Sequence, residues 1–382
     1  MCIIVYEYVE YKMTDKDYRL EKDSMGELKV PGEKHWGAQT QRAIENFKIS
    51  NIKMPSEFIQ SLALLKWALS AANSELGLLS SDKSEAIGRI ALEISEGNHH
   101  DEFPVDVFQT GSGTSTNMNM NEVIAHLSSS DDIPIHPNDD VNMGQSSNDV
   151  IPSAINVAAS VLIKSSLLGS LSHLQKTLEE KASSLSDVVK TGRTHLMDAM
   201  PITFGQEIGA WASQIEEAKR QFEATLPKMQ HLAIGGTAVG TGVNSHPDLS
   251  EKVSQLLNQK TGLNFQPSTD LFKAISSQDG SLELSSNARN LAVALIKIAN
   301  DLRWMNSGPL AGLGEISLPP LQPGSSIMPG KVNPVIPESV LMVAAQVIGN
   351  DATIVLAAQS GNFQLNVMLP VIAFNLIQSV SL

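Results

Sequence analysis

The chain has 382 residues, 42% of which are hydrophobic, and it carries a formal net charge of −14. This length predicts two or three domains, with enough apolar residues for a large core. The negative charge and the lack of a Lys/Arg cluster argue against a nucleic-acid partner, because binding a phosphate backbone needs a basic surface. The single cysteine, Cys2, excludes a disulfide within the chain and an iron–sulfur cluster held by several of its own thiolates.

The first residues do not have the pattern of a targeting segment. The apolar run in MCIIVYEYVEYKM is too short for a signal peptide, and the segment has too many acidic residues for a transit peptide. We therefore expect a cytoplasmic protein that starts at either Met1 or Met13.

Helical periodicity dominates the rest of the chain. Apolar residues recur at alternating steps of four and three between Phe58 and Leu76, and again between Ala288 and Met305. Residues 153–185 contain no proline and only one glycine, which permits an unusually long helix. Sustained strand alternation and short internal repeats are both missing, so the sequence predicts an all-α fold built around a helical bundle.

The stretch 339–380 is strongly apolar, and two interpretations compete for it. Its interruptions are Gln346, Asn350, Asp351, Gln359, Asn362 and Pro370. These polar residues argue against a membrane span. We therefore predict a pair of buried bundle helices here and no association with a membrane.

A polar, glycine-rich segment, QTGSGTSTNMNMNE, occupies residues 109–122. Ser112 lies between two glycines and precedes Thr114, and hydroxyls with free N–H groups at a helix start suit a carboxylate or a phosphate. The lysine of a nucleotide P-loop is missing. Taken alone, the segment is more typical of a plain helix N-cap.

A second polar segment, HPNDDVNMGQSSNDVIP, occupies residues 136–152. It contains four good N-cap residues, Ser146, Ser147, Asn148 and Asp149. These predict the start of the long helix, whose N-terminus would also attract an anion. His136 with two nearby aspartates has no third ligand at a fixed spacing, which argues against a metal site.

Two further segments break the helical pattern. TGRTHLMDAMPITFGQE, 191–207, places Thr194 and His195 in a polar loop, where the histidine is either structural or a general acid or base. GGTAVGTGVN, 235–244, is either a flexible turn or a backbone element near a site. EGNH, 96–99, has the Glu-x-x-His spacing of di-iron bundles in a single copy, and two copies are needed.

The segment GSSIMPGKVNP, 324–334, contains prolines and glycines that exclude a regular helix or strand. Ser325, Lys331 and Asn333 offer a nucleophile or base, a fixed cation and an amide donor. This combination suits chemistry on a carboxylate substrate.

Taken together, these segments resemble the aspartase/fumarase superfamily. GSSIMPGKVNP resembles its signature loop, and the similarity extends from EKDSMGELKVP, which begins at residue 21, to the end of the chain. Within the superfamily, GRTHLMDAMP with His195 resembles class II fumarases, because aspartases typically carry glutamine at that place. QTGSGTSTNMNMNE, HPNDDVN and QSSND are also similar to the fumarase forms.

The resemblance implies a mainly helical N-terminal lyase domain at 1–145 and a central helical-bundle domain at 146–382. It also implies a homotetramer whose central helices form one shared core, with each active site assembled from three subunits. Fumarases normally continue into a small third helical domain, which we expect to be absent from this chain because it stops at Leu382.

The implied activity is the reversible hydration of fumarate to (S)-malate, a reaction of the tricarboxylic acid cycle, with no metal or cofactor. Ser325 would remove the C3 proton to give an aci-carboxylate, and Lys331 and Asn333 would bind a carboxylate. His195, paired with Glu338, would act on the leaving hydroxyl through a water. The implied substrate contacts also include Ser112, Gly113, Thr114, Ser146, Ser147, Asn148, Thr194, Ser326 and Val332.

The resemblance also implies a second dicarboxylate site at His136, Pro137, Asn138 and Asp139. Some family members carry a basic residue just before this segment, where this chain has Ile133-Pro134-Ile135. Two alternative functions stay open: an aspartate ammonia-lyase of the same superfamily, which His195 argues against, and a non-catalytic helical scaffold.

Overall fold

The computed structural model describes residues 18–382, so Cys2 and Met13 lie outside the described residues. The N-terminal elements are β1 (Tyr18–Asp23), β2 (Gly26–Pro31), α1 (Ala38–Asn46), α2 (Ser56–Glu75), α3 (Ser81–Ser95), η2 (His100–Glu102), α4 (Thr114–Ser128) and η3 (Pro137–Val141). The central elements are α5 (Ser147–Leu162), η4 (Ile163–Leu167), α6 (Leu168–Ser184), β3 (Val189–Thr194), β4 (Met197–Thr203) and α7 (Phe204–Met229). The remaining elements are β5 (His231–Leu232), α8 (Leu249–Thr261), β6 (Gln266–Pro267), α9 (Leu271–Ser276), α10 (Asp279–Met305), α11 (Val335–Ala358), β7 (Gly361–Asn362), β8 (Leu365–Asn366) and α12 (Leu369–Ser381).

The predicted all-α fold is confirmed. Helices dominate, and every sheet in residues 18–382 has only two strands. The apolar face predicted between residues 58 and 76 lies in α2, where Phe58, Leu62, Leu65 and Leu69 are all fully buried. The boundary proposed between residues 145 and 146 stays a prediction.

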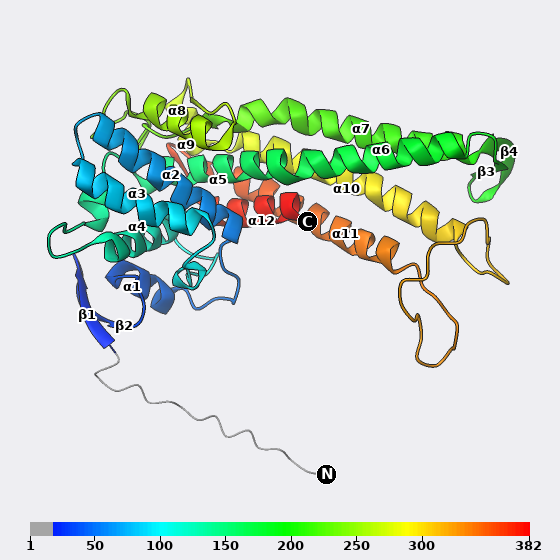
Figure 1. Cartoon of the computed structure of the whole chain (residues 1–382), viewed down its shortest axis with the longest axis horizontal. Coiled ribbons are helices and arrows are strands. Elements are labelled where there is room, and N and C mark those ends of the chain that lie inside the picture. The colour runs from blue at the N-terminus through cyan, green and yellow to red at the C-terminus, as the bar shows by residue number, and fades with distance from the viewer. Residues whose placement is uncertain (1–17) are drawn as a thin grey trace, which may run out of the picture.

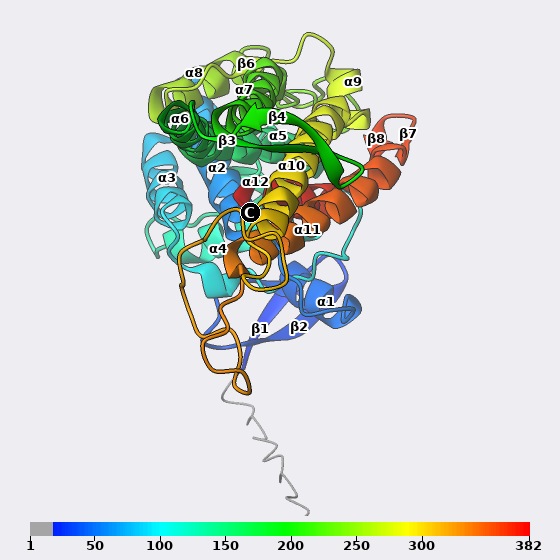
Figure 2. The same ribbon diagram turned by 90° about the vertical axis from the view of Figure 1, so that its right-hand side faces the viewer.

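The predicted long helix is present, and it begins at Ser147, among the N-cap residues that predict its start. α5, the π-helical turn η4 and α6 follow one another without a break from Ser147 to Ser184. α6 packs against α7, and α10 packs against both α7 and α11. These helices extend away from the compact N-terminal part and end in the β3–β4 hairpin and the long 306–334 segment (Figure 1). Viewed along its length, the molecule presents both of these segments at the same end (Figure 2).

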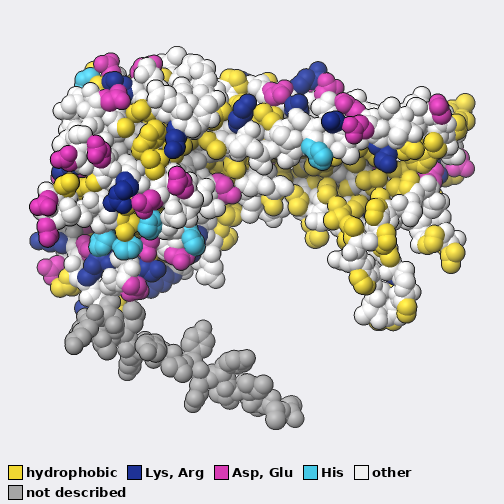
Figure 3. All heavy atoms as spheres, in the orientation of Figure 1, with side chains coloured by type: hydrophobic (Ala, Val, Ile, Leu, Met, Phe, Trp, Pro, Cys, Tyr) yellow, Lys and Arg dark blue, Asp and Glu magenta, His cyan; other side chains and the backbone are white. Residues whose placement is uncertain are grey.

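The apolar 339–380 stretch forms the expected pair of helices, but only one of them is well buried. Seven of the 13 residues of α12 are buried, against seven of the 24 residues of α11. Ile336, Met342 and Leu356 of α11 expose more than half of their surface. Apolar side chains therefore gather along the bundle in the space-filling view (Figure 3). By length and composition alone, both 147–184 and α11 are long and apolar enough to cross a membrane. Core helices of soluble proteins also meet these two criteria, so the finding is weak evidence for a membrane span.

Candidate active site

The segment 109–122 forms a tight loop followed by α4. Gly113 occupies the N-cap position with a φ of 73°, a left-handed conformation that favours glycine. The side chain that caps the helix comes from Gln109, whose Oε1 accepts from the Thr116 N–H at 2.9 Å. The hydroxyls of Ser112 and Thr114 lie 2.7 Å apart and bond to each other. The segment therefore begins a helix, as predicted, but neither of these two hydroxyls caps it.

The segment 136–152 does begin a helix in the predicted way. The Ser146 hydroxyl accepts from the Asn148 N–H at 3.2 Å, and the Asp149 carboxylate accepts from the Ser146 N–H at 3.0 Å, which together form a capping box. Asn117 of α4 donates to the Ser147 hydroxyl at 3.0 Å. The starts of α4 and α5 consequently lie side by side, and the first two polar segments meet in one site.

The glycine-rich segment 235–244 completes this cluster. The N–H groups of Gly235 and Thr237 donate to the Asp149 carboxylate at 3.1 and 2.9 Å, and Asn148 donates to the Ala238 carbonyl at 2.8 Å. The segment is thus a backbone element that holds the start of α5. Of the two interpretations left open by its sequence, the structure favours the one near a site.

His195 lies at the tip of the β3–β4 hairpin, where a polar loop was expected. Thr194 pairs with Met197, so His195 and Leu196 form a two-residue turn with φ values of 57° and 61°. Such turns favour Asn-Gly, and positive φ is costly for histidine and leucine. The strained turn holds the exposed imidazole out at the end of the bundle.

The 324–334 segment is irregular, as its prolines and glycines predict. The Ser325 hydroxyl accepts from the N–H groups of Ile327 and Met328 at 3.2 and 3.0 Å. Gly324 donates to the Lys331 carbonyl at 2.8 Å, and Asn333 donates to the Gly324 carbonyl at 3.0 Å. The loop therefore closes on itself and aims two N–H donors at one serine oxygen.

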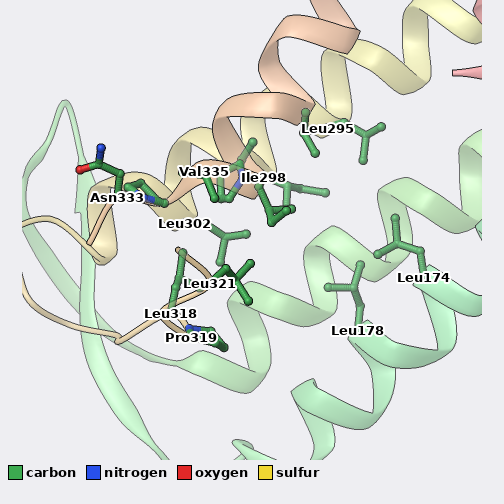
Figure 4. A pocket seen from close by; sticks show the side chains of 15 residues that line it. Leu174, Leu178, Leu295, Ile298, Leu302, Leu318, Pro319, Leu321, Asn333 and Val335 are labelled. Carbon is green, nitrogen blue, oxygen red and sulfur yellow. The ribbon is translucent and has the colours of Figure 1, made fainter. Parts of the chain in front are cut away.

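An apolar pocket of about 310 Å³ lies beside this loop (Figure 4). Leu174 and Leu178 of α6 and Leu295, Ile298 and Leu302 of α10 line it from the bundle side. Its walls offer almost no polar groups to a dicarboxylate. We therefore assign it to packing of the 318–321 segment on the bundle and not to the candidate site.

The comparisons with known proteins agree with the motifs. Residues 26–349 match the protein family described as Lyase. The class II fumarate hydratase of Xylella fastidiosa (strain Temecula1 / ATCC 700964) is 55% identical over 376 residues, which cover 98% of this chain and 80% of that protein. A class II fumarate hydratase of Pseudomonas aeruginosa is 56% identical over 367 residues, which cover 96% of this chain and 80% of that protein. The crystal structure of a class II fumarase from Schistosoma mansoni superimposes with a TM-score of 0.93 at 40% identity, covering 95% of this chain and 81% of that chain.

The chain belongs to the class II fumarate hydratase family. The resemblance drawn from its motifs is thereby confirmed.

This fumarate hydratase family member does not bring all its predicted site residues together within one chain. Ser112, Thr114 and Ser146–Asn148 lie near the N-terminal part, whereas the hairpin with His195 and the loop with Ser325 lie at the opposite end of the bundle (Figure 1). Within residues 18–382 of a single chain, no hydrogen bond or ion pair joins His195 to Glu338. That predicted pairing stays untested.

The predicted second dicarboxylate site lies elsewhere in the family member. His136, Pro137 and Asn138, but not Asp139, line a polar cavity of about 650 Å³. Arg19 and Lys22 of β1 also line it, and so do the acidic residues Glu21, Asp23 and Glu122. The segment around His136 contains no sign of these two cations, because they lie more than 100 residues before it. The nearby Asp140 carboxylate pairs with Lys83 at 2.8 Å.

One buried residue of the main site was also missed. Lys66 of α2 is fully buried beneath residues 142–145, and burial lowers the pKa of its ammonium to about 7, against the attraction of Asp149. Burial likewise raises the pKa of Asp149 to about 6, although N–H donors from Ser146, Thr237 and Gly235 oppose the shift. The sequence carries a signal for the buried lysine, since Lys66 interrupts the apolar run LALLKWAL.

Proposed function

We propose that this chain is a fumarate hydratase that interconverts fumarate and (S)-malate in the cytoplasm. Its 55% identity to a class II fumarate hydratase over 98% of its length is the observation that carries the proposal. Every residue proposed for the chemistry is present: Ser325, Lys331, Asn333, His195 and Glu338. We assign the proton transfers to these side chains, and we invoke no metal or organic cofactor.

In the direction of dehydration, the Ser325 alkoxide takes the C3 proton of malate. A serine alkoxide is costly in water, and the N–H groups of Ile327 and Met328 that point at Ser325 Oγ lower this cost. The electron pair of the broken C–H bond moves into the neighbouring carboxylate and gives an aci-carboxylate. Lys331 and Asn333 stabilise the charge that develops there, which is where preorganised donors contribute most.

The second step breaks the C–O bond. The electron pair of the aci-carboxylate returns to form the C=C bond of fumarate, and the hydroxyl leaves as water. His195, oriented by Glu338 of another subunit, supplies the proton through a bridging water. The acid and the base therefore act on opposite faces of the substrate, and the proton on Ser325 is afterwards lost to solvent.

We propose that the active site is completed by other copies of the chain in a homotetramer. The separation of the Ser146 cluster from His195 and Ser325 supports this arrangement, because the residues proposed for one site lie at opposite ends of a single chain. The exposed apolar residues of α11, such as Met342 at 69% and Leu356 at 62% exposure, support burial between bundles. Three subunits would contribute to each site.

We further propose that the cavity beside His136 and Asn138 is a second dicarboxylate site. Lys22 would supply the positive charge that the approach Ile133-Pro134-Ile135 lacks, because Arg19 already pairs with Glu21 at 2.7 Å. Titration with a dicarboxylate in a Ser325→Ala background should then show two classes of site, and Lys22→Ala should remove only one of them.

The proposed activity is tested by following the ultraviolet absorbance of fumarate in ammonia-free buffer. We expect the absorbance to fall with the purified protein, and Ser325→Ala to abolish the change. Ser317→Ala, a serine of the same irregular segment with no assigned contact, should retain activity. Turnover that requires ammonium would indicate an ammonia-lyase, and an intact tetramer inert in both buffers would indicate a scaffold.

A further inference from the structure

Lys66 holds the turn that precedes the substrate cluster. Its side chain lies entirely inside the protein, and its Nζ donates to Gln145 Oε1 at 2.7 Å and to Asn142 Oδ1 at 3.0 Å. Two turns further along α2, Asn73 donates to the Met143 carbonyl at 3.1 Å. α2 thus fastens residues 142–145 at three points, immediately before Ser146.

A chain of hydrogen bonds runs from Lys66 to Ser147. Asn142 Oδ1, which accepts from Lys66, also accepts from Asn117 Nδ2 at 3.2 Å. The same Asn117 Nδ2 donates to Ser147 Oγ at 3.0 Å. Lys66 is therefore connected to a proposed substrate hydroxyl through two amides, Asn142 in the turn before α5 and Asn117 in α4.

Lys66 determines which group donates and which accepts in each hydrogen bond between Lys66 and Ser147. An ammonium has three donors and no acceptor, and the neutral amine still has two N–H groups for its two oxygen partners. Asn142 must then present its oxygen, so Asn117 must face that oxygen with its NH2 group. The second N–H of this group points at Ser147 Oγ, which accepts.

An accepting Ser147 hydroxyl keeps its own proton for another partner. Within the described chain, no hydrogen bond has Ser147 as its donor. A substrate carboxylate can only accept hydrogen bonds, so a hydroxyl whose proton is free to be donated suits it. Asp149 secures the same turn from the other side, because its buried carboxylate accepts from Ser146, Gly235 and Thr237.

A role in stability alone does not explain Lys66. Its two partners are neutral amide oxygens, and no carboxylate lies within ion-pair distance of its Nζ in residues 18–382. Burying an ammonium without a directly bonded anion is costly, and an apolar side chain of similar volume would pack there with less penalty.

We propose that Lys66 is a positioning residue which, through Asn142 and Asn117, sets the Ser147 hydroxyl as a hydrogen-bond donor to a substrate carboxylate. This inference rests on the proposed function, because it takes Ser147 as a contact of a dicarboxylate. The role differs from that of the groups that touch substrate, since Lys66 acts only through the two amides.

The test compares Lys66→Met, which conserves volume, with the wild-type tetramer. We expect the KM for fumarate and malate to rise about tenfold or more, because a hydrogen bond to a charged group is lost, while kcat changes less than about threefold. Ser70→Ala is the matched control, because Ser70 is also buried in α2 and its hydroxyl donates to the Trp67 carbonyl, away from the 142–145 turn. It should leave KM unchanged.

A double-mutant cycle separates this role from a general loss of packing. In a Ser147→Ala background, Lys66→Met should cause almost no further rise in KM, whereas independent effects would multiply. If Lys66→Met does not fold, Asn117→Asp tests the same inference. The new carboxylate would accept a hydrogen bond from the Ser147 hydroxyl, so this proton would no longer be available to the substrate and KM should rise in the same way. An unchanged KM in a folded variant, or independent effects in the cycle, would overturn the inference.

If the protein is not a fumarate hydratase, the wild-type protein will not convert fumarate at all. The inference about Lys66 is then tested by calorimetry, which measures the binding of succinate in place of the kinetic assay. About tenfold weaker succinate binding by Lys66→Met would still support the inference. Equal binding by both proteins, or no binding by the wild-type protein, would overturn it.

Discussion

The guanidinium of Arg193 and the carboxylate of Glu315 are joined by two hydrogen bonds of 2.9 Å each. Arg193 directly precedes Thr194 and His195 in the hairpin, and Glu315 lies in the segment that leads from α10 to the Ser325 loop. Lys190 approaches the same carboxylate at 3.5 Å. One carboxylate therefore fastens the segments that carry both proposed proton-transfer residues.

Loss of this carboxylate should slow the reaction. Glu315→Gln removes the paired charge and one fork of the bidentate contact, so the hairpin should become more mobile and kcat should fall about tenfold or more. Glu283→Gln is the matched control, because Glu283 pairs with Lys228 far from the hairpin. Steady-state kinetics give the answer, and an equal kcat in both variants would contradict the proposed positioning.

The buried Lys66 should make stability depend on pH in a defined direction. Burial lowers its folded pKa to about 7, below the ordinary value of 10.5, so the folded protein loses this proton first as pH rises. Between pH 7 and 10 the unfolded chain binds more protons, and stability should therefore rise with pH. Asp149, with a pKa of about 6, stays ionised throughout this window.

The measurement is the unfolding temperature of the wild-type protein and of Lys66→Met from pH 7 to pH 10. The variant has no titrating group at this position. The unfolding temperature of the wild-type protein should therefore rise relative to that of Lys66→Met as pH increases. A constant difference across the window would show that Lys66 keeps its ordinary pKa.

A methyl group at Gly111 should push the loop before α4 away from the backbone that precedes α12. A Cβ at this position would lie 1.9 Å from the Val367 carbonyl oxygen, which belongs to the backbone and cannot rotate away. Gly111→Ala should therefore destabilise the protein by about 1–3 kcal/mol or more. It should also disturb the adjacent Ser112 and raise KM.

Gly169→Ala is the control for this substitution. Gly169 lies inside α6, and no other atom is within 4 Å of a Cβ built there. Alanine at this position should stabilise the helix by about 0.5–1 kcal/mol. Urea unfolding of both variants measures the two changes, which should have opposite signs.

A charge on the exposed face of α11 should prevent subunit association. Leu356 is 62% exposed in a single chain, and Leu356→Lys would place an ammonium in the proposed interface between bundles. We expect smaller oligomers by light scattering and loss of activity. Met25→Lys introduces the same charge at an 80% exposed apolar residue in the β1–β2 turn and should leave the tetramer intact. A tetrameric, active Leu356→Lys protein would contradict the proposed interface.

Local patterns were sufficient for much of the fold. The four- and three-residue spacing from Phe58 to Leu76 predicts the buried face of α2, because helix periodicity depends only on neighbouring residues. The N-cap residues at 146–149 predict the start of α5 for the same reason. The β3–β4 hairpin was missed, since its turn at His195 and Leu196 has none of the residues that usually signal such a turn.

The sequence by itself determined the family, the helical class and the identity of the proposed catalytic residues, because motifs and periodicity are properties of consecutive residues. Only the tertiary structure decided which distant segments meet. It placed Gly235 and Thr237 on Asp149, Lys66 beneath Asn142, and Glu315 on Arg193. Such contacts depend on how helices far apart in the chain pack together, and packing depends on the shapes of whole faces that no short segment encodes.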